Sequence, residues 1–260
     1  MLLAAGRGDR MRPLTDTCPK PLLQVHGKPL MQWHLEALAR GGTARVVINT
    51  AWLGQLIAQT FHDVFVLQPL LDKRRQLSTT EHLHIDYSHE GIDFGAALET
   101  AGGISRALPL LCPQSGEGEV FWVLASDVFV PDFAFDQAAV ARFIASGKLA
   151  HLWLVPNPHH NPRGDFGLDA ATGLALNLPA DDARLRYTYS TIGLYHRALF
   201  APPWCSIAPG NPQGIKAALA PLLRAAMAQG QVSAELYTDA WTDVGTPERL
   251  AQLNQPQATA

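Results

Sequence analysis

Near its start the chain reads Leu3-Ala4-Ala5-Gly6-Arg7-Gly8-Asp9-Arg10-Met11-Arg12-Pro13-Leu14-Thr15, and Pro19-Lys20-Pro21-Leu22 follows after three residues. The apolar residues 1–4 predict a strand, and the Gly, Arg, Asp, Thr and Pro residues after it predict a long loop. Glycines at the end of a strand allow backbone N–H groups to approach phosphate oxygens, while the arginines and Lys20 supply positive charge. We therefore expect this loop to bind a polyphosphate, although it has neither the Gly-Lys-Ser/Thr of a Walker loop nor the third glycine of a dinucleotide-binding loop.

Strands and helices are predicted to alternate beyond this loop. Met31, Leu35 and Leu38 recur at helical spacing before Gly41, a residue typical of a helix C-cap. We expect a β-branched strand over 45–49, a helix over 53–61, a strand around 83–87, a helix over 99–110, and an apolar strand over 120–125 that ends at Ser126-Asp127.

The second half of the chain is predicted to contain more strands. We expect a helix over 136–145, strands over 149–155, 174–178 and 187–195, a helix over 215–227, and a last helix from Thr246-Pro247. This order predicts an α/β fold with a doubly wound, mixed but mostly parallel sheet and a small β-rich flap. Ligands of such sheets bind at the carboxyl ends of the strands, where Gly6 and Asp127 fall.

Composition argues against several classes of partner. The 260 residues carry a formal net charge of -3, so the chain lacks the cationic surplus that nucleic-acid binding requires. Its three cysteines, Cys18, Cys112 and Cys205, are far apart, which predicts free thiols rather than disulfides or a zinc site. No apolar run reaches the length of a membrane span and no signal peptide is recognisable, so we expect a cytoplasmic protein with no membrane partner.

The opening string resembles the signature of the sugar-1-phosphate nucleotidyltransferases, Leu-x-x-Gly-x-Gly-x-Arg-x-x-Pro-Leu-Thr ending in Pro-Lys-Pro-Leu. The likeness extends through residues 49–55, 98–104, 127–128, 157–160, 163–166 and 241–250. Within the family, the acidic residue before Arg10, the Trp-Leu-Gly-Gln segment over 52–55, Glu99-Thr100, and His159-His160 with the Arg-Gly-Asp-Phe segment over 163–166 most resemble the uridylyltransferases of N-acetylmuramate α-1-phosphate.

This resemblance implies the Rossmann-like nucleotide-diphospho-sugar transferase (GT-A-like) fold. We expect a single domain over 1–253, with a nucleotide-binding half over about 1–130 and a sugar-binding half over about 131–253 that carries the flap. Residues 254–260 are expected to form a flexible tail.

The resemblance also implies transfer of a nucleotidyl group from UTP to a sugar 1-phosphate, with Mg²⁺ as cofactor and pyrophosphate as the second product. Mg²⁺ takes one or two carboxylates together with phosphate oxygens, a set that two aspartates at separate strand ends can supply. No side-chain nucleophile is needed, because an oxygen of the sugar phosphate attacks the α-phosphorus. The implied roles are nucleotide binding by Gly6, Gly8, Asp9, Arg10, Lys20, Glu90 and Gly102, catalysis by Arg10, Lys20 and Asp127, metal binding by Asp127 and Asp243, and sugar binding by Asn157, Arg163, Gly164 and Lys216.

Several of these assignments have a plainer alternative. Asp127 could instead cap a turn, and Asp243 could organise the last helix. Glu90 and Gly102 are candidates for recognising the N–H and carbonyl groups of uracil, but both also suit an ordinary helix entry. Lys216 is otherwise a surface lysine. Arg163 is a candidate partner for the lactyl carboxylate of N-acetylmuramate.

Three features depart from the family pattern. The first strand is short, so we expect a chain extended upstream of Met1 to be more stable. Ser126 stands where the family prefers glycine, and we expect its side chain to crowd the nucleotide. Extra residues occur around 72–80, between Glu90 and Leu98, and between Lys216 and Pro221. They weaken the assignments of Glu90 and Lys216 most and do not affect residues 6–20, Asp127 or Asp243.

Three functions remain open from the sequence. The first is transfer of UMP from UTP to N-acetylmuramic acid α-1-phosphate in peptidoglycan recycling. A mannose-1-phosphate guanylyltransferase, or a glucose-1-phosphate thymidylyl- or uridylyltransferase, would use the same loop, lysine and aspartates with a different base pocket and flap. A non-catalytic regulatory protein that binds nucleotide sugars would keep the fold, but the intact Lys20, Asp127 and Asp243 argue against it. The sequence does not indicate the oligomeric state.

Overall fold

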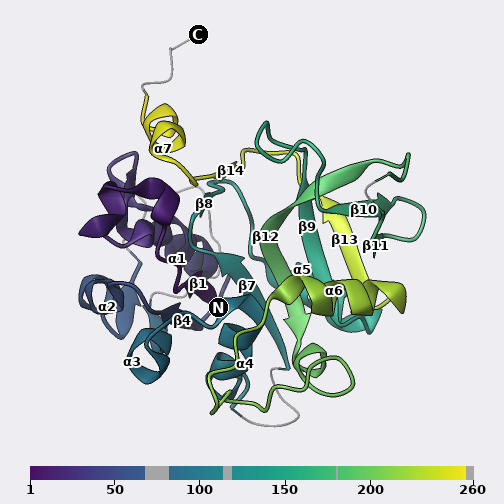
Figure 1. Cartoon of the computed structure of the whole chain (residues 1–260), viewed down its shortest axis with the longest axis horizontal. Helices are drawn as coiled ribbons and strands as arrows, with labels where there is room; N and C mark the ends of the chain where they lie inside the picture. Colours follow the sequence, from purple (N-terminus) through teal and green to yellow (C-terminus); the bar gives the residue numbers. More distant parts are fainter. Residues whose placement is uncertain (68–81, 114–118, 180, 256–260) are drawn as a thin grey trace. The chain divides into compact units, whose positions relative to one another are not determined.

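The chain forms two compact units, each built from segments that are distant in the sequence (Figure 1). The computed structural model describes residues 1–67, 82–113, 119–179 and 181–255. Unit 1 comprises Met1–Leu2, Leu98–Ala125 and Asp136–Asp239, and unit 2 comprises Leu3–Ala97, Ser126–Phe135 and Ala240–Ala260. The two units therefore interleave along the chain, whereas the sequence suggested two consecutive halves that divide near residue 130. The longer segment around 72–80 lies outside the described residues.

A small sheet with the strand order β1-β4-β6-β5 forms the centre of unit 2. β4 (Arg45–Thr50) and β6 (His82–His89) are parallel, and β5 (Val64–Val66) runs antiparallel to β6. β1 (Leu2–Ala4) is fixed next to β4 because the N–H of Ala4 donates to Oδ1 of Asn49 at 2.9 Å. β4 is buried from Val46 to Thr50, as is typical of a strand covered on both faces.

Local signals in the sequence set the ends of the helices in unit 2. α1 (Leu30–Arg40) ends at Gly41, where an added Cβ would lie 2.0 Å from the backbone oxygen of Phe135. α7 (Pro247–Leu253) begins after Thr246, whose side chain accepts a hydrogen bond from the N–H of Arg249. The remaining helical elements are α2 (Gly54–Phe61), α3 (Glu90–Phe94) and the 3₁₀ turns Asp9–Met11, Leu14–Asp16 and Lys20–Leu22.

Two short ladders and a local apolar core complete unit 2. β2 (Gln24–Val25) pairs with β3 (Lys28–Pro29), and β8 (Val128–Phe129) pairs antiparallel with β14 (Thr242–Asp243). The core therefore ties the opening loop to the β8–β14 ladder, because both contribute buried side chains to it. Its members are Met11, Leu23, Val25, Leu30, Phe129 and Val244.

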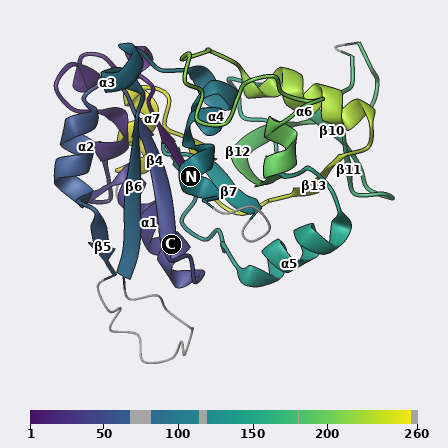
Figure 2. The ribbon, with the colours of Figure 1, turned by 90° about the horizontal axis from the view of Figure 1, so that it is seen from below.

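Unit 1 contains a mixed sheet with the order β10-β11-β13-β9-β12-β7. Figure 2 shows α4 and α6 on one face of this sheet and α5 on the other. β13 and β9 are parallel, while β12 runs antiparallel to both β7 and β9. The elements are α4 (Glu99–Leu111), β7 (Val120–Ala125), α5 (Gln137–Ser146), β9 (Ala150–Val155), β10 (Phe166–Asp169), β11 (Leu174–Leu176), β12 (Arg186–His196), a 3₁₀ helix (Arg197–Phe200), α6 (Leu219–Ala228) and β13 (Val232–Leu236).

The expected α/β class is confirmed, and the predicted strands and helices are present. The sheet of unit 1 is less parallel than expected, because β12 reverses direction between β7 and β9. The helix expected over 215–227 starts only at Leu219, because Ala217 hydrogen-bonds to α4 instead of entering the helix. Asn254, expected in the flexible tail, bonds to Gln24 and His26, while residues 256–260 lie outside the described residues. Among the described residues, no helix is long and apolar enough to cross a membrane.

Candidate active site

The opening loop of unit 2 is shaped around Gly8. Gly8 has a φ of +72°, in the left-handed region that favours glycine, and its carbonyl accepts hydrogen bonds from the N–H of Met11 and the hydroxyl of Thr15. An added Cβ would lie 3.1 Å from Cγ2 of Thr15 and 3.4 Å from Cβ of Lys20. Glycine at this position therefore allows the lysine stem to pack against the loop. At Gly6, by contrast, an added Cβ would meet nothing within 4 Å.

The basic residues of this loop differ in their partners. Lys20 is buried, and its Nζ donates to Oδ2 of Asp127 at 2.5 Å. Arg7 donates to Asp9 at 2.9 Å, and its guanidinium lies 3.9 Å from the ring centroid of Trp52. Arg12 pairs with Asp16. Within the described part of the chain, Arg10 has no ion-pair partner and is exposed, so it is the loop's uncommitted cation.

The two predicted metal ligands are brought together in unit 2 by the β8–β14 ladder. The N–H of Val244 donates to the carbonyl of Asp127 at 2.9 Å, and Asp243 lies opposite Val128. Asp243 pairs with Arg249 at 2.7 Å, as Asp127 pairs with Lys20. Both carboxylates are accessible, since 36% of the Asp127 side chain and 20% of the Asp243 side chain are exposed. Each candidate ligand is thus neutralised by a neighbouring cation.

Residues beneath this ladder hold it in place. Ring atom Nε2 of His34, in α1, lies 2.8 Å from the carbonyl oxygen of Val128, to which the neutral ring donates. Burial lowers the pKa of His34 to about 4, outweighing the opposing effects of this hydrogen bond and of the charge on Asp127. The hydroxyl of Ser126 donates to the carbonyl of Leu3 at 2.7 Å, and its side chain is 2% exposed. The hydroxyl of this serine is therefore turned onto β1, and the expectation that its side chain crowds the nucleotide stays a prediction.

Glu90 is an internal residue of unit 2. It is 0% exposed and accepts a hydrogen bond from Nδ2 of Asn49 at 2.7 Å, and the same Asn49 side chain accepts from β1. Its carboxylate therefore links the start of α3 to β4. This placement gives no support to contact with uracil, which stays a prediction.

In unit 1, the loop that carries Lys216 packs against the first turn of α4, which contains Gly102. The carbonyl of Ala217 accepts from the N–H groups of Ala101 and Gly102, and an added Cβ at Gly102 would lie 2.4 Å from the carbonyl oxygen of Ile215. Asn211, which is fully buried, donates to the carbonyls of Gly102 and Ile215 and accepts from the N–H of Ile215. Close packing against the loop around Lys216 thus requires glycine at position 102. Lys216 itself is exposed on this loop, which Asn211 holds against α4.

Asn157 and Gly164 organise the loop that precedes β10. Nδ2 of Asn157 donates to the carbonyl of Arg186, and its Oδ1 accepts from the hydroxyl of Thr188 at 3.0 Å. Gly164 has a φ of +60°, and an added Cβ would lie 2.7 Å from Oδ1 of Asn157. Both residues shape the loop, and Arg163 is exposed on it. Asn157 is exposed as well, so both the asparagine and the arginine present their side chains to solvent.

Three residues that hold parts of the candidate site in place were not predicted from the sequence. Arg249 binds a predicted metal ligand, Asn211 seats the Lys216 loop, and Trp52 donates from Nε1 to the carbonyl of Thr15 while carrying Arg7 on its ring. Trp52 and Arg249 both lie in segments that carry the family resemblance, which was the only available signal. Asn211 had no signal at all.

The comparisons with known proteins agree with this geometry. A family model described as nucleotidyl transferase matches residues 1–171. The chain is also 41% identical over 261 residues to an N-acetylmuramate alpha-1-phosphate uridylyltransferase of Neisseria meningitidis serogroup B, covering 100% of this chain and 97% of the relative. The chain belongs to the nucleotidyl transferase family.

More distant similarities include a guanyltransferase and a solved structure. This nucleotidyl transferase is 26% identical over 249 residues to the mannose-1-phosphate guanyltransferase beta-B of Xenopus laevis, covering 95% of this chain and 61% of that one. A crystal structure described as a glucose-1-phosphate thymidylyltransferase from Bacillus anthracis superposes with a TM-score of 0.68 at 17% identity, covering 97% of this chain and 92% of that chain. The second comparison supports the fold alone.

The donor set of this nucleotidyl transferase fits magnesium bound together with a substrate. The described residues contain no cluster of three or more His, Cys, Asp or Glu side chains that could enclose a metal ion. Asp127, in the turn just before β8, and Asp243, in β14, instead provide two carboxylates at one antiparallel ladder. Mg²⁺ commonly takes one or two carboxylates and completes its shell with phosphate oxygens and water.

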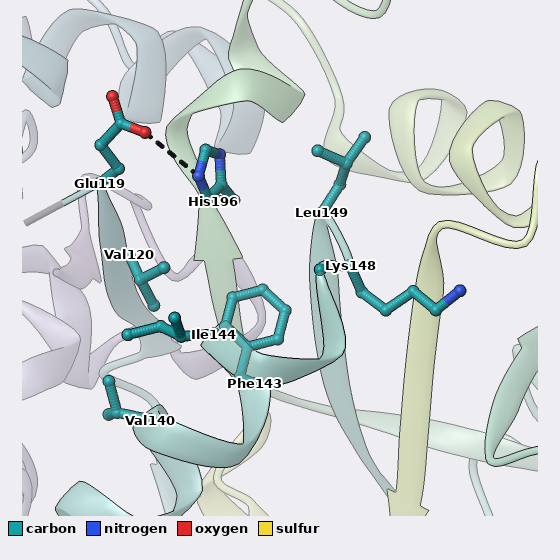
Figure 3. Close-up of a pocket in the computed structure, with 9 residues that line it drawn as sticks. Glu119, Val120, Val140, Phe143, Ile144, Lys148, Leu149 and His196 are labelled. Atoms are coloured by element: carbon teal, nitrogen blue, oxygen red, sulfur yellow. Dashed lines mark ion pairs between the residues drawn. The ribbon is translucent and has the colours of Figure 1, made fainter. Parts of the chain in front are cut away.

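A separate pocket of about 450 Å³ lies in unit 1 at the amino end of β7 (Figure 3). Asp127 follows the opposite, carboxyl end of the same strand. Phe143 and Ile144 of α5 line it beside Val120. His196 and Glu119 form an ion pair at one side, 3.2 Å apart. None of the predicted site residues lines this pocket, so it is distinct from the candidate active site.

Proposed function

We propose that this nucleotidyl transferase transfers UMP from UTP to N-acetylmuramic acid α-1-phosphate, giving UDP-N-acetylmuramate and pyrophosphate, as a cytoplasmic step of peptidoglycan recycling. The observation that supports the proposal is that Lys20 of the opening loop pairs with Asp127, and that the backbone of Asp127 is bonded to Val244, the residue after Asp243. The choice of UTP and of N-acetylmuramate rests on the relative from N. meningitidis, which is similar over the whole chain.

The reaction needs charge neutralisation more than covalent help from the protein. An oxygen of the sugar phosphate attacks the α-phosphorus of UTP and forms a new P–O bond, while the bond from this phosphorus to the pyrophosphate oxygen breaks. Both substrates are anionic, so electrostatic repulsion opposes their approach. Positioned cations and backbone N–H groups lower this barrier.

The residues of unit 2 have distinct parts in this scheme. The backbone around Gly8 and Asp9 faces the triphosphate, and the uncommitted Arg10 neutralises its charge. Lys20 exchanges its contact with Asp127 for a phosphate oxygen when the substrates bind. Asp127 and Asp243 hold Mg²⁺, which when bound supplies Lewis-acid stabilisation of the phosphate oxygens.

The residues of unit 1 serve the sugar phosphate. Lys216, exposed on the loop that Asn211 seats, pairs with the phosphate of the sugar. Arg163 pairs with the lactyl carboxylate of N-acetylmuramate. Asn157 and Gly164 act indirectly, by holding the loop that carries Arg163.

A substrate matrix tests the proposal. UTP, GTP, dTTP and ATP are each combined with the 1-phosphates of N-acetylmuramate, mannose and glucose, with pyrophosphate release as the readout, with and without Mg²⁺. We expect the highest kcat/KM for UTP with N-acetylmuramic acid α-1-phosphate, and no turnover when EDTA is present.

Other outcomes select other functions. A preference for GTP and mannose 1-phosphate would indicate a mannose-1-phosphate guanylyltransferase instead. A preference for glucose 1-phosphate and either dTTP or UTP would indicate a glucose-1-phosphate thymidylyl- or uridylyltransferase. Binding of nucleotide sugars with no pyrophosphate release from any pair would indicate a non-catalytic regulatory protein. Asp182→Asn is a control for substitutions of the site aspartates, because Asp182 pairs with Arg184 in an exposed ion pair that is not part of the site.

A further inference from the structure

Asp243 is held by an arginine from the helix that follows it. Nη1 of Arg249 donates to Oδ2 of Asp243 at 2.7 Å and to the backbone carbonyl of Asp243 at 3.0 Å. Because one nitrogen bonds to both the carboxylate and the backbone, it fixes the direction of the carboxylate relative to β14. The contact is largely shielded from water, since the two side chains are 18% and 20% exposed.

The surrounding motif is built to place this arginine. The side chain of Thr246 caps α7 by accepting from the N–H of Arg249, and Pro247 starts the helix. At Gly245 an added Cβ would lie 2.9 Å from Oδ1 of Asp243 and 3.0 Å from Nη2 of Arg249. The space that a side chain would fill at this position is therefore occupied by the ion pair.

The ion pair is compatible with metal binding. A carboxylate has about four lone-pair positions, so it can accept from a guanidinium and still bind a cation. Asp243 keeps 20% of its side-chain surface exposed and lies opposite Val128, the residue after Asp127. In metal sites, hydrogen-bonding partners of the ligands orient them, and removing such a partner typically costs about 10- to 100-fold in metal affinity.

We infer that Arg249 is a positioning residue for the metal, acting through Asp243. Its guanidinium directs the carboxylate of Asp243 toward the ion that Asp127 shares, which outweighs the repulsion between the guanidinium and a divalent cation. This inference rests on the proposed function, since it requires that Asp127 and Asp243 bind the metal. It extends that function to a residue outside the predicted site.

Metal affinity measured without turnover tests the inference. Mn²⁺ replaces Mg²⁺ as the probe, and free Mn²⁺ is measured by electron paramagnetic resonance in the presence of the unreactive analogue α,β-methylene-UTP. We expect Arg249→Gln to weaken Mn²⁺ binding at least about 10-fold. Arg249→Lys keeps the charge but loses the planar guanidinium, so it should recover part of the affinity.

A double-mutant cycle with Asp243→Asn distinguishes positioning from general destabilisation. If Arg249 acts through Asp243, then Arg249→Gln should change Mn²⁺ affinity by less than twofold in the Asp243→Asn background. Arg184→Gln, which breaks the exposed pair with Asp182, is the matched control and should leave Mn²⁺ binding unchanged. Circular dichroism on every variant identifies any that fail to fold, and Arg249→Lys then carries the comparison.

The outcomes separate this inference from the proposed function. Unchanged or tighter Mn²⁺ binding by folded Arg249→Gln would overturn the inference, because the charge of the arginine would then matter more than its orienting bonds. So would an equal loss of affinity in the wild-type and Asp243→Asn backgrounds. Turnover of UTP and N-acetylmuramic acid α-1-phosphate by the wild-type protein is measured independently, and its absence would overturn the proposed function instead.

Discussion

Replacing His34 with glutamine tests whether a buried neutral imidazole makes this protein sensitive to acid. His34 is 1% exposed and donates from Nε2 to the carbonyl of Val128, the residue after Asp127. The Nε2 amide of glutamine can donate to the same carbonyl but does not titrate. The His34→Gln variant therefore keeps the hydrogen bond while removing the proton-binding group.

The size of the effect follows from the pKa of this residue. Burial lowers the pKa of His34 from its ordinary value of 6.5 to about 4. The folded protein therefore binds this proton less readily than the unfolded chain, so the stabilisation is present above pH 6.5 and is lost as the pH falls toward 4. At 1.36 kcal/mol per pKa unit, linkage predicts a loss of about 2 kcal/mol between pH 7 and pH 5, and about 3 kcal/mol by pH 4.

Urea denaturation at pH 7, 6 and 5 measures this loss. The free energy of unfolding of the wild-type protein should fall by about 2 kcal/mol more than that of His34→Gln between pH 7 and pH 5. Carboxylates contribute equally to both proteins, so the difference isolates the histidine. Parallel pH dependence in the two proteins would refute the reasoning, because His34 would then titrate alike in the folded and unfolded states.

Asp127→Asn should lower kcat by at least about 10³-fold while far-UV circular dichroism stays unchanged, since it removes the charge of a proposed metal ligand whose side chain is accessible; retention of full activity would remove the metal assignment. Gly102→Ala should cost about 1–3 kcal/mol in urea denaturation, because its Cβ would lie 2.4 Å from the carbonyl of Ile215. It should also raise the KM for the sugar phosphate, whereas Gly95→Ala, at a glycine with open space but a φ of +73°, should alter stability alone. Burial raises the pKa values of Tyr189 and Tyr195, whose hydroxyls lie 2.6 Å apart. Stability should therefore fall as the pH rises above 10, and Tyr189→Phe should reduce this slope in thermal melts; an identical slope would count against it.

The elements of the fold could be predicted because each carries a local signal. Gly41 marks the end of α1, Thr246-Pro247 marks the start of α7, and the apolar run over 120–125 matches β7. The helix expected from Ile215 begins only at Leu219, because the backbone of Ala217 hydrogen-bonds to α4 instead of joining the helix. The spacing of apolar residues within a helix contains no information about such a tertiary contact.

The candidate site was predictable in part. The family resemblance indicated the loop, Lys20 and both aspartates, and the structure brings these residues together in unit 2. Residues that act by bonding to them were not predictable, because a bond such as Arg249 to Asp243 depends on the direction in which a helix leaves its cap. Asn157 and Gly102 were assigned to ligands, while their visible contacts hold loops.

The interleaving of the units has a consequence for the order in which a growing polypeptide can mature. The glycine-rich loop emerges early from the ribosome, but the partner strand of β8 and the second carboxylate reside in β14, more than a hundred residues after Asp127. A nascent chain that has not yet exposed Thr242 and Asp243 therefore has the opening loop but an unpaired β8. A two-carboxylate metal site of the kind proposed above can therefore form only after β14 has been synthesised.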